Sequence, residues 1–268
     1  RRAIHNIRID SDLGSGSNTL ISSHRIPRIL PRGVRYKGRI HEQPAHSLPI
    51  IEASVTVRHD GYMQEQLDTK KGRNMALLEK SLAERPEDPY VHFQLGKQYD
   101  IQMQYAEALP CYQRARELVR NRPTWYHDLV VRTIECLRHE GRLEEAMMFA
   151  SDEMPYWERS ADFYFVVGCL LLDQMQKRPE QGESLLPMIE ESWLKALAIG
   201  ERPELAGNVS GRGSFMAAGQ LWALFDARKE AEKAARYKDM QKKLYAQYKE
   251  AADAGLVSAA ALPEQQPA

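Results

Sequence analysis

The sequence predicts a mainly α-helical protein in which antiparallel helix pairs follow one another, preceded by a short segment of β structure. Three observations lead to this prediction. Apolar and small residues recur at helical spacing from residue 63 onward. A glycine-centred pattern returns after 72 residues, twice 36, at Gly96 and Gly168. The first 62 residues instead alternate apolar and basic side chains between prolines and glycines, which is typical of strands and turns.

The helix-pair pattern is clearest in residues 89–118, PYVHFQLGKQYDIQMQYAEALPCYQRAREL. Gly96, Ala108 and Ala115 are small enough to let two antiparallel helices approach closely. Tyr99 and Tyr112 can fill the space beside them. Together with a spacing close to the tetratricopeptide period of about 34 residues, this order of residue types predicts a tetratricopeptide-like α-solenoid.

Later units repeat the pattern more weakly. One is centred on Gly168 with Trp193 in its second helix, another on Gly219, and a degenerate unit covers residues 126–150. An insertion rich in Gln, Glu and Pro predicts an irregular loop over residues 173–187. The repeat domain is therefore assigned to residues 63–258, and residues 259–268 are expected to form a disordered tail.

Strand candidates before residue 63 lie in residues 26–40 and 51–59. Two strands alone are marginally stable in water, so we expect them to need partners. "YKGRIHEQ" and "VRHDGY" place His41 and His59 at predicted strand ends, where a histidine can bind a divalent ion or transfer a proton. Glu42 could act as a base, and plain solvated histidines are the alternative interpretation. A zinc-binding HExxH site is excluded, because His41 and His46 are five apart with Pro44 between them.

Charge is balanced overall, with 37 basic and 37 acidic residues, which argues against nucleic acid and membrane surfaces as partners. Residues 1–46 carry nine Lys and Arg against three acids, a net charge of +6, and the remainder carries −6. This basic segment favours an anionic small ligand or is a solvated loop. The three cysteines form no paired motif and no apolar run is long enough to span a bilayer, so a cytoplasmic location is expected.

One glycine-rich stretch, "GNVSGRGSF", precedes a predicted helix at Phe215. Backbone N–H groups at such a helix start can hold an anion. Ser214 acting as an ordinary N-cap is the favoured interpretation.

The segments "RIPRILPRGVRYKGRIHEQP", "VTVRHDGY" and "KGRNMALLEKSLAERPEDPYVHFQLGKQY" resemble the C-terminal half of family-2 glycosyltransferases with appended tetratricopeptide repeats. The resemblance covers residues 26–118. It implies that residues 1–62 are the C-terminal remnant of a GT-A-type α/β catalytic domain, which transfers a sugar from a nucleotide-diphosphate donor. The implied roles are catalysis for His41 and Glu42, substrate binding for Arg39, Gly61 and Tyr62, and metal binding for His59.

The donor-binding half of such an enzyme has no counterpart in this sequence. Asp10-Ser11-Asp12 has the letters of its metal motif, but no apolar strand is predicted to lead into it. The opening at Arg1 suggests a fragment, so Mn²⁺ or Mg²⁺ is expected only with the missing half, and the chain alone is expected to be inactive.

Two functions follow from these patterns. In the first, the chain completes the acceptor side of a glycosyltransferase, and its repeats position a peptide, protein or glycan acceptor. In the alternative, it is a non-catalytic tetratricopeptide-repeat adaptor, whose groove is lined with polar and basic residues such as Gln94, Lys97, Gln98 and Arg132. Self-association through the array is a further prediction.

Overall fold

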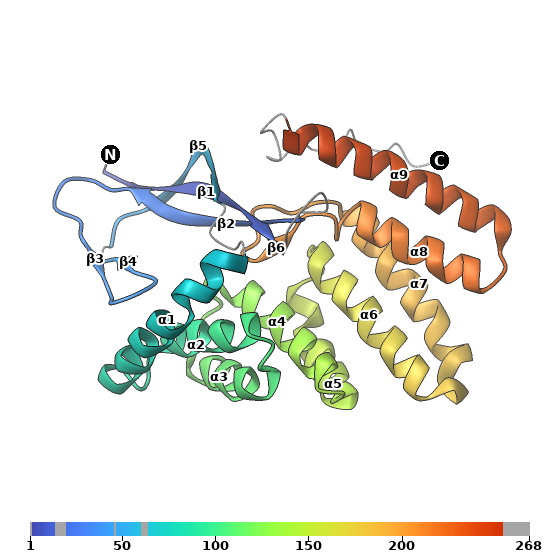
Figure 1. The fold of residues 1–268 in the computed structure, drawn as a ribbon, viewed down its shortest axis with the longest axis horizontal. Coiled ribbons are helices and arrows are strands. Elements are labelled where there is room, and N and C mark those ends of the chain that lie inside the picture. Colours follow the sequence, from blue (N-terminus) through green and yellow to red (C-terminus); the bar gives the residue numbers. More distant parts are fainter. Residues whose placement is uncertain (1, 14–19, 46, 60–63, 254–268) are drawn as a thin grey trace. The chain divides into compact units, whose positions relative to one another are not determined.

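The computed structural model describes residues 2–13, 20–45, 47–59 and 64–253, and the expected tail at 259–268 lies outside them (Figure 1). The chain divides into two compact units, residues 1–140 and 141–268. The first contains a small sheet and four helices, and the second consists mainly of helices. The boundary predicted at residue 62 stays a prediction.

The sheet of the first unit has a central strand with one antiparallel and one parallel neighbour. β1 pairs antiparallel with β2 and parallel with β5. A separate hairpin follows β2, and its strands β3 and β4 have two residues each. The strand bounds are β1 Ile4–Leu13, β2 Leu20–Ile29, β3 Tyr36–Lys37, β4 Gln43–Pro44 and β5 Ile50–His59.

Residues 51–59 were predicted as a strand and lie in β5, whereas β1 was not predicted. Ile4, Ile7 and Ile9 are buried in β1, so an apolar strand does lead into Asp10, contrary to expectation. The strand is hard to recognise because it also buries Arg8 and Asp10, whose Nε and Oδ1 atoms lie 2.6 Å apart. A buried charge is tolerated when it is paired in this way. Residues 26–40 hold the end of β2 and β3 rather than a longer strand.

The helices pack mainly against their neighbours in sequence. Within the two units, α2 packs on α3, α6 on α7 and α8 on α9. The first unit contains α1 Gln64–Glu84, α2 Pro89–Ile101, α3 Tyr105–Leu118 and α4 Tyr126–His139. The second contains α5 Leu143–Glu153, α6 Ala161–Lys177, α7 Gly182–Ile199, the short strand β6 Asn208–Val209, α8 Phe215–Ala227 and α9 Ala231–Asp253. Among the described residues, no helix combines the length and the apolar character needed to cross a membrane.

The irregular loop predicted over residues 173–187 was wrong. α6 continues to Lys177 and α7 begins at Gly182, so only a short turn separates them. The many Gln and Glu residues of this stretch are good helix formers. Pro179 lies in the turn itself, and Pro187 is accommodated inside α7.

In each of two helix pairs, an aromatic ring of one helix packs against a glycine of the other. A Cβ atom added to Gly96 of α2 would lie 2.5 Å from Tyr112 Cε1 of α3. One added to Gly168 of α6 would lie 2.4 Å from Trp193 Nε1 of α7. Trp193 is 1% exposed, and its Nε1 donates a hydrogen bond to the Phe165 carbonyl at 3.2 Å. The close approach predicted from the small residues is therefore confirmed.

Replacing Gly168 with Ala tests this contact. The methyl group has no room beside the buried indole, so Gly168→Ala is expected to lower the free energy of unfolding by about 1–3 kcal/mol. The matched control is Gly72→Ala in α1, where an added Cβ meets nothing within 4 Å. That change should be neutral or stabilise by about 0.5–1 kcal/mol, because Ala favours helix. Urea titration measures both, and equal midpoints for the two variants would contradict the prediction.

Candidate binding pocket

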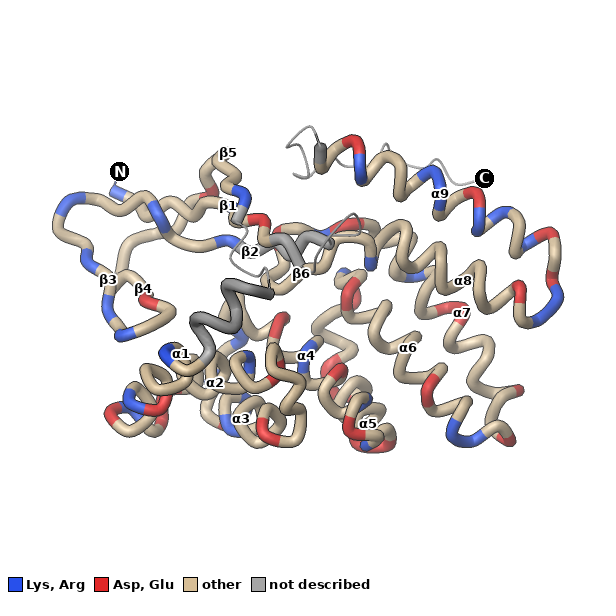
Figure 2. The backbone as a smooth tube through the Cα atoms, in the orientation of Figure 1, with Lys and Arg blue, Asp and Glu red and all other residues tan. Residues whose placement is uncertain are grey.

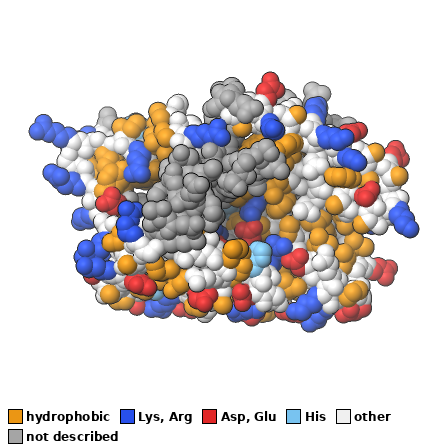
Figure 3. Space-filling model, in the orientation of Figure 1, with side chains coloured by type: hydrophobic (Ala, Val, Ile, Leu, Met, Phe, Trp, Pro, Cys, Tyr) orange, Lys and Arg blue, Asp and Glu red, His pale blue; other side chains and the backbone are white. Residues whose placement is uncertain are grey.

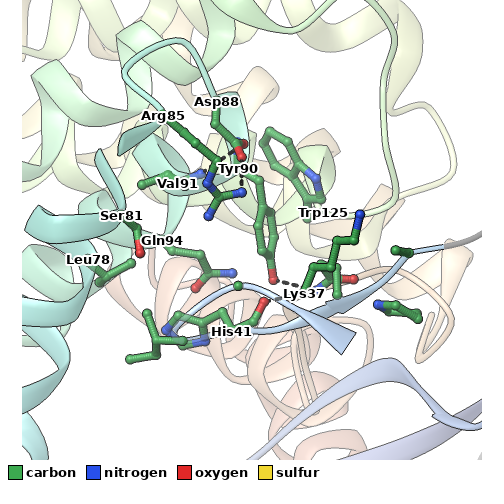
Figure 4. A pocket seen from close by; sticks show the side chains of 15 residues that line it. Lys37, His41, Leu78, Ser81, Arg85, Asp88, Tyr90, Val91, Gln94 and Trp125 are labelled. Carbon is green, nitrogen blue, oxygen red and sulfur yellow. Dashed lines mark hydrogen bonds and ion pairs between the residues drawn. The ribbon is translucent and has the colours of Figure 1, made fainter. Parts of the chain in front are cut away.

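A pocket of about 360 Å³ lies in the first unit, where the β3–β4 hairpin covers α1 and the start of α2 (Figure 4). It is open to solvent on one side and combines apolar walls with a few polar groups. The labelled residues around it are Lys37, His41, Leu78, Ser81, Arg85, Asp88, Tyr90, Val91, Gln94 and Trp125.

Side-chain contacts link the hairpin to β2 and to the helices α1 and α2. Tyr36 Oη donates a hydrogen bond to the Pro27 carbonyl at 2.5 Å, which ties β3 to β2. Arg39 forms a two-pronged ion pair with Glu84 of α1. Gln43 Nε2 donates to Tyr90 Oη of α2 at 3.0 Å. The pocket is therefore built jointly by the segment 36–45 and the first helices.

Gln94 is one of the polar residues that line the pocket. The residue is 8% exposed, and Figure 4 shows its amide pointing into the pocket. Among the described residues it has no hydrogen-bond or ion-pair partner. The amide faces the pocket, so a ligand in the pocket can supply its hydrogen bonds. Gln94 is one of the polar residues that the sequence predicted to line the groove of an adaptor.

Aromatic rings form one wall of the pocket. Tyr90 and Trp125 have ring centroids 5.8 Å apart, and Trp125 stacks on Phe93 at 4.8 Å. Phe93 is fully buried, so it holds Trp125 in place from behind. The Trp125 ring is a rigid apolar surface for a ligand to contact.

His41 lines the pocket as a neutral imidazole. Its backbone has a positive φ of 51°, and part of the residue is exposed on the hairpin surface. Protein atoms nevertheless crowd the ring, and this desolvation, followed by the nearby Lys97 ammonium, lowers the pKa of His41 to about 4. A neutral imidazole offers one donor and one acceptor nitrogen, so His41 can pair with a polar group beside Gln94.

Of the other residues predicted to carry function, none that the structure describes lines the pocket. Glu42 is exposed and does not line the pocket, and the Arg39 guanidinium is paired with Glu84 instead of facing a ligand. His59 ends β5, but its side chain is not among those described, and Gly61 and Tyr62 lie outside the described residues. In the part of the chain that the structure describes, no three His, Cys, Asp or Glu side chains cluster in a way that could hold a metal ion.

Two of the basic residues predicted to line a groove, Lys97 and Arg132, are paired with carboxylates of the same unit. Lys97 Nζ lies 2.8 Å from Asp128 Oδ2, and Arg132 contacts both Asp128 at 2.6 Å and Asp100 at 2.5 Å. Burial alone would raise the pKa of Asp128, but Arg132 and Lys97 outweigh it and lower that pKa. Two cations therefore face two carboxylates, and the network joins α2 to α4 without net charge.

The glycine-rich stretch before α8 is also used internally. Ser214 does not cap the helix, contrary to prediction. Its Oγ donates to Glu201 Oε1 at 2.5 Å, and the Gly211 N–H donates to the same oxygen at 2.9 Å. The Gly211 N–H and the Ser214 hydroxyl thus bind the protein's own Glu201 side chain, at the place where an anion site was the less favoured alternative. Burial first, and the nearby Asp162 carboxylate, raise the pKa of Glu201 to about 7 despite these hydrogen bonds.

The raised pKa predicts how stability depends on pH. Between pH 4.5 and 7 the folded state keeps the Glu201 proton while the unfolded chain loses it, so the contribution of Glu201 falls as pH rises through 7. At about 1.4 kcal/mol per pH unit this penalty is at most about 3 kcal/mol. Glu201→Gln removes it and keeps an acceptor for Gly211 and Ser214.

Urea unfolding at pH 5, 6, 7 and 8.5 measures this effect. The Gln variant should be more stable than the parent above pH 7, with the difference shrinking toward pH 5. Glu204→Gln is the control, because that exposed carboxylate pairs only with Arg202 among the described contacts. A pH-independent difference for Glu201→Gln would contradict the prediction.

Comparison with solved structures identifies the fold as tetratricopeptide-like. A MamA double mutant from strain RS-1 superposes with a TM-score of 0.53 at 13% identity, covering 67% of this chain and 88% of that one. Another MamA structure gives 0.50 at 16% identity over 70% and 96% of the two chains. PilF of Pseudomonas aeruginosa gives 0.50 at 18% identity over 66% and 69%. All three are tetratricopeptide-repeat proteins.

No family model and no curated protein matches the chain. At these identities the solved structures establish the helical array alone, which confirms the predicted fold class. The resemblance to glycosyltransferases stays a proposal.

Proposed function

We propose that this chain is a protein-binding module that holds an extended segment of a partner, with one side chain of that segment inserted in the pocket. The observation that carries this proposal is the Gln94 amide, which faces the pocket and has no side-chain partner among the described residues. Binding pockets typically combine apolar walls with a few polar groups that fix orientation. A volume of about 360 Å³ is near the lower end of ligand pockets, which suits a side chain better than a large cofactor.

The surroundings of the pocket support a peptide as ligand. Tyr90 and Trp125 offer aromatic surface, which is enriched where proteins anchor side chains of a partner. His41 and Gln94 line the pocket from two different elements, the hairpin and α2 (Figure 4). A partner side chain with an apolar body and a polar end could contact the aromatic rings and hydrogen-bond to His41 or Gln94. An apolar side chain together with its backbone amide could do the same.

Replacing Gln94 tests the proposal. The immobilised full chain is used to select from a displayed library of random twelve-residue peptides, and the affinities of the selected peptides are measured by fluorescence anisotropy. Gln94→Leu keeps the side-chain size but removes the amide, so it should weaken binding by about tenfold or more. Gln113→Leu is the control, because Gln113 is exposed on α3 and contacts only Glu117 among the described side chains.

Both variants should unfold at the urea concentration of the parent within a small margin, which separates lost binding from lost folding. Unchanged affinity of the selected peptides for Gln94→Leu would show that the pocket is not their site. A library that enriches no sequence on the parent chain would overturn the proposal as a whole.

A second candidate function is a part in glycosyl transfer, as the sequence resemblance implies. The observation that favours it is that His41 of the His-Glu motif does line the pocket, together with Lys37 and Gln43. In this proposal the pocket holds part of the acceptor or of the nucleotide-sugar donor. Mn²⁺ or Mg²⁺ would neutralise the diphosphate when bound, and His59 is the residue that the motif assigns to it.

Thermal denaturation in the presence of a panel of nucleotide-diphosphate sugars, with and without Mn²⁺, tests this second function. If the pocket binds such a donor, one member of the panel should raise the melting temperature of the full chain. His41→Ala should abolish that shift, and His139→Ala, at the far end of α4, should retain it. A panel without any shift would remove the donor from consideration.

A further inference from the structure

The segment 26–45 has a positive charge that the rest of the described chain does not neutralise. It contains five basic residues against the single acid Glu42. Arg39 is paired with Glu84. The other four have no carboxylate partner among the described residues, and we call them the basic rim: Arg28, Arg32, Arg35 and Lys37.

Some arginines elsewhere in the chain do have such a partner: Arg114 pairs with Glu87, Arg142 with Glu145 and Arg178 with Glu144. The basic rim instead faces solvent, and all four residues are exposed. Figure 2 shows Lys and Arg recurring along the tube between β2 and β4, and Figure 3 shows basic side chains projecting at that edge of the molecule.

One member of the basic rim lines the pocket itself. Arg35 directly precedes β3, Tyr36–Lys37, so Arg35 and Lys37 flank Tyr36 in the same segment. Lys37 lines the pocket, and the Arg35 carbonyl accepts a hydrogen bond from the Ala45 N–H at 3.0 Å at the adjacent end of the hairpin. Arg28 lies over the Tyr36 ring, 5.9 Å from its centroid.

The segment is also held in shape, so its charges cannot simply spread apart. Pro27 and Pro31 each fix a backbone φ angle, and the Tyr36 hydroxyl is bonded to the Pro27 carbonyl. Arg2 donates to the Arg32 carbonyl, which adds a further cation to the same loop. Like charges that are held within a few screening lengths, about 8 Å each at physiological salt, repel one another and create a positive potential.

From these contacts we propose that the partner segment is acidic, with its anchoring side chain in the pocket and its flanking carboxylates over the basic rim. The inference rests on the proposed binding function and adds the chemistry of the partner. The apolar walls require an anchor, and the unpaired cations at the mouth attract the negative charges beside it. A nucleic acid has a continuous row of phosphates longer than this rim, and it offers no side chain for the pocket. The net charge of the whole chain, zero, does not favour it either.

Three fluorescent peptides test the proposal on the full chain by anisotropy. The first has one phenylalanine flanked on each side by three glutamates, the second has glutamine in place of every glutamate, and the third has alanine in place of the phenylalanine. The first should bind about tenfold or more tightly than either of the others, because it alone supplies both the anchor and the charges. Raising NaCl from 50 to 300 mM should weaken the first peptide about fivefold and leave the second nearly unchanged.

Removing positive charge from the basic rim of the protein should weaken binding of the glutamate peptide. Arg35→Gln combined with Lys37→Gln should cost the first peptide about tenfold in affinity and leave the second unaffected. The control is Lys242→Gln with Lys243→Gln on α9, which removes the same charge from another surface. The loss should be confined to the rim variant.

The outcomes separate this inference from the proposed function. If glutamine peptides bind as tightly as glutamate peptides and lose affinity in Gln94→Leu, the pocket binds peptides but the acidic partner is overturned. If the rim and control variants lose affinity equally, the attraction is only overall charge and the inference fails. If single-stranded DNA or vesicles of anionic lipid displace the first peptide at lower concentration than the unlabelled peptide does, the rim serves that polyanion instead and the inference is likewise overturned.

Discussion

The packing of an aromatic ring against a glycine on the facing helix is the contact on which the first unit depends. Because Gly96 has no side chain, the Tyr112 ring fits against α2, and its hydroxyl donates to Asp100 at 3.2 Å. Asp100 in turn holds Arg132 of α4, so one close approach fixes a helix pair and the position of the next helix. Phe93, on the same helix as Gly96, packs against both Tyr112 and Trp125. The position of Trp125 in the pocket wall therefore depends on the same Gly96–Tyr112 packing that holds α2 against α3.

The charges of the first unit follow from this packing. The network of Lys97, Asp100, Asp128 and Arg132 is nearly enclosed, and each member lowers the cost of burying the others. Removing one partner would leave an uncompensated charge, so the network stabilises α2 against α4 and is poorly suited to releasing its cations to a ligand. The cations of this network are therefore not available to a ligand, whereas the basic rim on the hairpin side of the pocket has no carboxylate partner among the described residues.

Sequence reasoning succeeded where a structural property is local and periodic. Small and aromatic residues at fixed offsets predict which helix faces meet, and Gly96 and Gly168 do contact aromatic residues of their partner helices, Tyr112 and Trp193. His41, a predicted site residue, lines the pocket, and its role stays a prediction. Prediction failed where the partner is distant in sequence: Ser214 bonds to Glu201 rather than capping its helix, and the pairing of Arg39 with Glu84, 45 residues away, was not foreseen. Which polar groups remain unpaired, as Gln94 does, depends on all such distant pairings at once.

The pocket exists because the hairpin covers the surface of α1 and α2. How strongly the hairpin is held to these helices therefore affects binding. Its contacts with the helices are the exposed Arg39–Glu84 pair and the hydrogen bond from Gln43 to Tyr90. Exposed ion pairs contribute about 0–1 kcal/mol, so the hairpin can shift at little cost while β3 stays tied to β2 through Tyr36. Tyr90 touches both the hairpin and Trp125, so such a shift would change the aromatic wall and the charged rim together. A ligand that contacts both is therefore favoured over one that contacts either alone.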